Sequence, residues 1–144
     1  MQRDQMLWAK GLALLGATPF IAAVVGQLAG MANYHTGYLS LTYGAIIISF
    51  LSGIHWGLYL THAKARRINL LISSNVIALL AWLPLLLLIP VTQYLIQITC
   101  FISLLLIDRQ LLADGAIERW FYQLRQQISL LVIGCLLLLV SLQP

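Results

Sequence analysis

The chain has 144 residues, of which 61% are hydrophobic and only 8% are charged. Soluble proteins average about 25% charged residues, so this composition excludes an ordinary water-soluble domain. The formal net charge is +4, but the chain lacks the solvated basic domain that a nucleic-acid interface needs. We therefore expect a protein of the lipid bilayer that binds no nucleic acid and whose basic residues set its topology and contact anionic headgroups.

Apolar runs recur along almost the whole chain. A helix needs about 20 residues to cross a hydrocarbon core of roughly 30 Å. Five segments qualify, at residues 7–29, 38–60, 70–89, 91–112 and 121–142. The runs are continuous, whereas a membrane β-barrel requires alternation. We predict an all-α integral membrane bundle of five transmembrane helices that forms a single domain over residues 1–144.

The first segment contains Pro19 near its middle. A proline inside a helix lacks a backbone donor and frees a carbonyl, so we expect a kink and a hydrogen bond to that carbonyl from Thr18 or a neighbouring helix. Arg3 and Lys10 precede the apolar stretch, as in a secretion signal. The length of the stretch and the lack of a clear cleavage site favour an uncleaved anchor.

The charged residues fall in three clusters. They are Arg3, Asp4 and Lys10; then Lys64, Arg66 and Arg67; then Asp108, Arg109, Asp114, Glu118, Arg119 and Arg125. Five crossings place all three clusters on one side of the membrane and the uncharged connections at 30–37 and 90–93 on the other. The positive-inside rule then predicts a multi-pass protein of the bacterial inner membrane with a cytoplasmic N-terminus and an external C-terminus.

The third cluster occupies the connection at 108–127. We expect Asp114 and Gly115 to end one helix before the next begins, and Arg119 and Arg125 to extend to the headgroup region. Asp108 and Arg109 are expected to cap the fourth helix and pair with the basic turn at residues 64–67, and a role for Asp108 as a proton acceptor stays open.

The second segment carries a ridge of small side chains spaced four residues apart. They are Ala45, Ser49, Gly53 and Gly57. A small-xxx-small ridge lets another helix approach closely, so we predict that this ridge contacts a neighbouring helix. The opposite arc is expected to face lipid. It consists of Tyr43, Ile47, Phe50, Leu51, Ile54 and Leu58.

His55 lies at the flank of this ridge, inside the membrane. A polar group there is costly unless it has a partner. At about 1.5 Å per residue, Asn75 of the next helix reaches nearly the same depth. We predict that His55 is neutral and bonds Asn75, Ser74 or a backbone carbonyl, which would pin the second helix to the third.

A small-molecule site around His55 is the alternative. Trp56 and Tyr59 would form an aromatic wall for a quinone or a lipid, with Asn75 as a hydrogen-bonding end. The other members of this candidate binding set are Ser52, Ser74, Asp108 and Arg109.

Haem, metal and catalytic sites are less favoured. Haem would need a second histidine at matching depth, and His35 and His62 belong to loops on opposite sides, so a symmetric dimer would have to supply it. Cys100 and Cys135 are expected to be apolar core residues, and no Cys or His pair has the spacing of a metal site. Ser52 and His55 share one helix without a nucleophile turn, so we expect no catalytic residues.

Two glutamines, Gln27 and Gln97, are expected to make hydrogen bonds between helices. A transport path through Gln97 or Asp108 is a third hypothesis, although five crossings do not divide into two related halves.

Four stretches resemble the transmembrane protein 69-like family, a domain of unknown function in bacterial and mitochondrial membrane proteins. They are "LGATPF" at 15–20, "YGAIIISFLSGIHWG" at 43–57, the Trp82 and Pro84 pair, and "DR" at 108–109. The resemblance implies a helical membrane protein without a soluble domain, and it supplies no activity. Our first hypothesis is therefore a non-enzymatic accessory, assembly or scaffold protein whose partners are other membrane proteins or a second copy.

Overall fold

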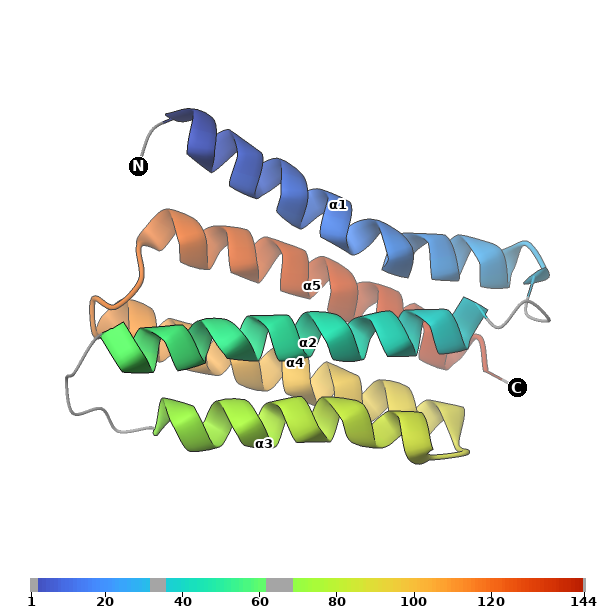
Figure 1. Cartoon of the computed structure of the whole chain (residues 1–144). Helices are drawn as coiled ribbons and strands as arrows, with labels where there is room; N and C mark the ends of the chain where they lie inside the picture. Colours follow the sequence, from blue (N-terminus) through green and yellow to red (C-terminus); the bar gives the residue numbers. More distant parts are fainter. Residues whose placement is uncertain (1–2, 32–35, 62–68, 144) are drawn as a thin grey trace.

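A computed structural model describes residues 3–31, 36–61 and 69–143 of the chain. Long helices run back and forth between the two ends of a bundle (Figure 1). They are α1 (Arg3–Leu28), α2 (Thr36–Thr61), α3 (Leu70–Trp82) with the short 3-10 helix η2 (Leu83–Leu86), α4 (Pro90–Ala113) and α5 (Arg119–Ser141). The described residues contain no strand. The predicted all-α fold of five helices is therefore confirmed.

Four of these helices, α1, α2, α4 and α5, are long and apolar enough to cross a membrane. Helix α3 has only 13 residues, or about 20 Å at the helical rise of 1.5 Å per residue. It ends at Trp82 because Pro84 lacks a backbone donor, and the chain tightens there into η2. A second proline, Pro90, opens α4, where its fixed backbone angle suits the first turn of a helix.

Helix α1 continues through Pro19. The ring of Pro19 removes the donor that would reach the carbonyl of Leu15, four residues earlier. Thr18 Oγ1 donates to this Leu15 carbonyl oxygen at 2.7 Å, which confirms the predicted compensation. Helix α1 is inclined to the other helices of the bundle (Figure 1).

The core of the bundle lies around α4, whose most apolar stretch has the largest buried share among the four long helices. Phe20 of α1 makes edge-to-face contacts with Phe101 of α4 and with Tyr43 of α2. Gln97 Nε2 donates to the backbone oxygen of Leu41 at 2.6 Å, and therefore joins α4 to α2.

The predicted polar links between helices are confirmed for both glutamines. Besides the bond from Gln97 to α2, Gln27 near the end of α1 accepts a hydrogen bond from Thr36 Oγ1, the first residue of α2, at 3.4 Å. Such bonds are worth roughly 0.6 to 2 kcal/mol each inside a membrane.

The face of α2 that packs differs from the predicted one. Ala45 is buried, but Ser49, Gly53 and Gly57 are exposed, so the predicted seam is wrong over most of its length. The close approach occurs instead at Gly44, where an added Cβ would collide with the Gln97 side chain. Helix α2 is rotated in this way because its polar side chains meet those of α4. The buried line consists of Ser40, Leu41, Gly44, Ala45, Ile48, Ser52 and His55.

The arc of α2 that was predicted to face lipid is also mostly covered. Only Phe50 of its six members is exposed, at 68%, and the other five are half-buried. Tyr43, for example, donates its hydroxyl hydrogen to the backbone oxygen of Gly16 at 3.0 Å, so this side of α2 contacts α1.

The charged residues of the described chain gather at one end of the bundle. The start of α1, the end of α2 and the connection between α4 and α5 lie at that end (Figure 1). This connection turns at Gly115, whose φ of 70° is left-handed, while the Ala116 amide donates to the Leu111 oxygen at 2.8 Å. The predicted break at Asp114 and Gly115 is thus confirmed. The predicted basic turn at 64–67 lies outside the described residues.

Candidate functional site

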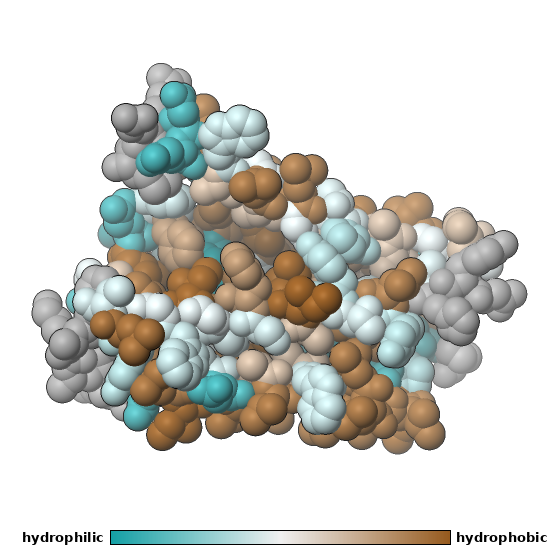
Figure 2. Space-filling view, viewed as in Figure 1, coloured by the Kyte–Doolittle hydropathy of each residue, from teal (hydrophilic) through white to brown (hydrophobic). Residues whose placement is uncertain are grey.

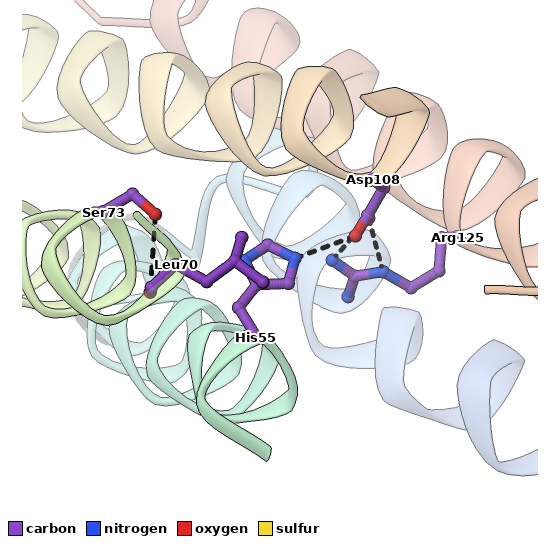
Figure 3. A network of polar contacts seen from close by, with 5 residues as sticks. All are labelled: His55, Leu70, Ser73, Asp108 and Arg125. Atoms are coloured by element: carbon purple, nitrogen blue, oxygen red, sulfur yellow. Dashed lines mark hydrogen bonds and ion pairs between the residues drawn. The ribbon is translucent and has the colours of Figure 1, made fainter. Parts of the chain in front are cut away.

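Three polar side chains meet in the interior near the charged end of the bundle (Figure 3). His55 comes from α2, Asp108 from α4 and Arg125 from α5. Their exposed fractions are only 0%, 2% and 7%. A membrane protein rarely buries ionisable side chains unless they are paired, so this cluster is the most unusual feature of the interior.

The Asp108 carboxylate is the centre of the cluster. His55 Nε2 donates to its Oδ1 at 2.9 Å, and Arg125 Nε donates to its Oδ2 at 3.0 Å. Arg125 Nη2 lies 2.9 Å from the same Oδ2. Because a carboxylate only accepts hydrogen bonds, the contact with Oδ1 places a proton on Nε2 of the imidazole. One carboxylate thus holds three helices together.

Several buried polar side-chain atoms have no hydrogen-bond partner within the described residues, and all but the Gln97 oxygen belong to this cluster or to Ser52, three residues before His55. They are Ser52 Oγ, His55 Nδ1, Gln97 Oε1 and Arg125 Nη2. For Arg125, Nη2 is close to Asp108 but poorly directed, since Nε occupies the better position on Oδ2.

The predicted partner of His55 on the third helix is wrong. Asn75 is exposed, and its Nδ2 donates to the Leu71 oxygen of its own helix at 2.7 Å. Ser74 is buried but likewise donates to Leu71, at 3.0 Å. A short polar side chain on a helix readily bonds the carbonyl one turn earlier, which leaves the imidazole to α4.

The structure brings together only part of the predicted binding set. His55 contacts Asp108, and Ser52 and Ser74 are buried on α2 and α3. Trp56 and Tyr59 are each 41% exposed, so they do not enclose the imidazole as the predicted aromatic wall would.

Asp108 and Arg125 of the third charged cluster differ from their predicted roles, whereas the predicted pairing of Arg109 with the turn at 64–67 stays a prediction, because that turn lies outside the described residues. Arg109 is exposed beside the buried Asp108, and Asp108 pairs with Arg125. The prediction that Arg125 extends to the headgroups is therefore wrong. Its position could have revealed this, because Arg125 precedes Ser129, Val132 and Leu136 at the spacing of one buried helix face.

An apolar cavity of about 380 Å³ lies beside the cluster, between α1, α2, α4 and α5. Arg125 and Ser129 are its polar members, whereas His55 is not among the residues that form its wall. The other wall residues are Ala9, Leu12, Ala13, Gly16, Phe20, Ile47, Phe50, Leu51, Ile54, Phe101, Trp120, Phe121, Leu124, Ile128 and Val132. The imidazole and the cavity are thus separate features.

Within the described residues, no group of three or more His, Cys, Asp and Glu side chains is placed to hold a metal ion. Cys100 is buried and Cys135 half-buried, and both are free thiols. His35 and His62, which entered the argument about haem, lie outside the described residues.

Comparison with known proteins gives one family and one partial relative. A sequence profile described as "Protein of unknown function (DUF3429)" matches residues 6–141. "Transmembrane protein 69" of Xenopus tropicalis is 39% identical over 79 residues, which cover 52% of this chain and 31% of the relative. The match therefore spans about a third of that curated relative. No solved structure matches the chain. The chain belongs to the DUF3429 family of membrane proteins, whose function is unknown.

Proposed function

We propose that this protein is a non-catalytic scaffold of the bacterial inner membrane, which presents α2 to a transmembrane helix of another protein or of a second copy. The orientation we propose puts the charged end in the cytoplasm. It is supported by the described charged residues, which belong to the first part of α1, the last part of α4, the connection after it and the first part of α5, all toward one end of the bundle (Figure 1).

The buried cluster supports a structural role in preference to chemistry. Both oxygens of Asp108 are engaged, one by His55 and the other by Arg125. His55 is fully buried and lies outside the cavity wall, so a ligand in the cavity does not meet the imidazole. A carboxylate that joins three helices holds the bundle in one arrangement, as a scaffold requires.

The scaffold proposal rests on the exposed ridge of Ser49, Gly53 and Gly57 on α2. These residues lie four apart, and an added Cβ at either glycine would meet no atom within 4 Å. In lipid, helices associate through close packing at small residues. No other helix of the described chain covers this ridge, so it is available to a helix from outside. Brown, hydrophobic side chains cover much of the side of the molecule seen in Figure 2.

Native mass spectrometry of the protein, extracted gently from its own membrane, tests this proposal. We expect the wild type to carry a protein partner in addition to its own 16.0 kDa. Gly53→Leu should release the partner, because the larger side chain prevents close approach.

Gly134→Leu is the matched control, since Gly134 on α5 also has open space around an added Cβ. This variant should keep the partner. A wild type that appears only as a single chain, or a Gly53→Leu variant that keeps its partner, would refute the scaffold proposal.

A further inference from the structure

The apolar cavity has the length of one membrane leaflet. Its wall runs from Ala9 to Phe20 on α1 and from Trp120 to Val132 on α5. At 1.5 Å per residue these stretches are roughly 17 Å long. Half of a hydrocarbon core of about 30 Å is about 15 Å. The cavity therefore extends from the charged end to about the middle of the bundle, as an acyl chain of one leaflet does.

The charged end of the cavity is suited to an anion. Lys10 follows the wall residue Ala9, and Arg119 precedes the wall residue Trp120; both cationic side chains are exposed. Deeper in the same wall lies Arg125, but its guanidinium is already paired with the Asp108 carboxylate, with Nη2 2.9 Å from Oδ2, so the anion would meet the exposed cations at the mouth. Figure 2 shows this region as a recess between the first part of α1 and α2.

The first turn of α5 adds a second feature that favours an anion. The N-cap residue, Glu118, makes no side-chain hydrogen bond to the backbone of this turn. Its carboxylate instead accepts a hydrogen bond from the Trp120 indole. The free amides at a helix start and the helix dipole favour negative charge, and this start lies where the cavity wall begins.

We propose that the cavity holds one acyl chain of an anionic phospholipid, whose phosphate lies at the charged end beside Lys10 and Arg119. The wall supplies apolar contact along the chain, and the two cations distinguish an anionic headgroup from a zwitterionic one. Trp120 and Phe121 lie at the depth where aromatic side chains meet headgroups. The site does not depend on the proposed scaffold role, because it faces α1 and α5 rather than the exposed ridge of α2.

Lipid competition measured by native mass spectrometry tests this site. The purified, delipidated chain is mixed with detergent micelles that contain equal amounts of phosphatidylglycerol and phosphatidylcholine with the same acyl chains. We expect one phosphatidylglycerol to stay bound to each wild-type chain. Ala13→Phe fills the cavity from α1 and should lower this occupancy about tenfold or more.

Two further variants keep the cavity test decisive. If Ala13→Phe does not fold, Ala9→Phe fills the cavity one turn nearer the charged end and should lower the phosphatidylglycerol occupancy in the same way. Ala22→Phe is the control, because Ala22 is exposed on the same helix and lies outside the cavity wall. It should bind lipid as the wild type does.

The headgroup contact is tested with charge variants. Lys10→Gln and Arg119→Gln should each reduce the preference for phosphatidylglycerol about fivefold. Arg109→Gln should leave it unchanged, since Arg109 is an exposed cation on α4 away from the cavity wall. Equal binding of the two phospholipids to the wild type, or undiminished phosphatidylglycerol occupancy in both Ala13→Phe and Ala9→Phe, would overturn the proposal.

Discussion

Oδ1 of Asp108 lies 2.9 Å from Nε2 of His55, although 53 positions of sequence separate the two residues. The other oxygen of the same carboxylate binds Arg125. The histidine in the apolar run of α2 is therefore paired with a carboxylate on α4, which in turn neutralises an arginine on α5. This arrangement explains how a chain with few charged residues can bury three ionisable side chains near the end of its bundle.

The first prediction concerns the centre of the cluster. Asp108→Asn leaves the buried Arg125 without a counter-charge, and breaking a buried ion pair costs about 3 to 5 kcal/mol. We expect the free energy of unfolding in mild detergent to fall by about this amount. Asp114→Asn is the control, because Asp114 is exposed at the same end, and it should change stability by less than about 0.5 kcal/mol.

A second prediction concerns His55. His55→Ala removes the donor to Asp108 Oδ1 and leaves a space in the core, so we expect a loss of about 2 to 3 kcal/mol in the same unfolding measurement. Trp56→Phe, at the neighbouring exposed position, should unfold almost as the wild type does. Equal losses in the two variants would mean that the imidazole is not part of the buried cluster.

The third prediction separates two glycines of α2. Gly44→Ala should destabilise the bundle by about 1 to 3 kcal/mol, because the new Cβ collides with the Gln97 side chain. Gly53→Ala should be neutral or stabilise by up to about 1 kcal/mol, since alanine is the better helix former and space is open there. If thermal unfolding showed a larger loss of stability for Gly53→Ala than for Gly44→Ala, the ridge predicted from sequence would be the packed face of α2.

The proposed orientation gives the fourth prediction. In a variant whose two native cysteines are replaced by alanine, a single cysteine is placed at Asp114 or at Met31, which are exposed near opposite ends of the bundle. A maleimide that does not cross the inner membrane should label Met31→Cys in intact cells. Asp114→Cys should react only after the membrane is opened. Labelling in the opposite order would reverse the topology.

The helices could be predicted from the sequence because a long, continuous apolar run in lipid can satisfy its backbone hydrogen bonds only as a helix. Thr18 was predictable as the partner of the Leu15 carbonyl, since Pro19 leaves that oxygen free and a threonine lies beside it. The roles of Gln27 and Gln97 followed from the same reasoning, because a buried amide in lipid needs a partner on another helix.

The rotation of α2 could not be predicted from its own residues. The spacing of Ser49, Gly53 and Gly57 indicated a packing ridge, but the helix turns another face inward. The choice depends on Asp108 and Gln97 of α4, which attract His55 and fit against Gly44. The residue pattern of one helix shows which side chains share a face. Which of its faces is buried depends on polar partners elsewhere in the chain.

The central claim is that one buried carboxylate couples the helices, and a double-mutant cycle of Asp108→Asn and Arg125→Gln tests it most directly. If Asp108 and Arg125 are partners, each single variant leaves the other group unpaired, and the double variant should lose less stability than the sum of the two losses, by about 1 to 3 kcal/mol. Losses that simply add would contradict the account, because they would show that the two side chains act independently.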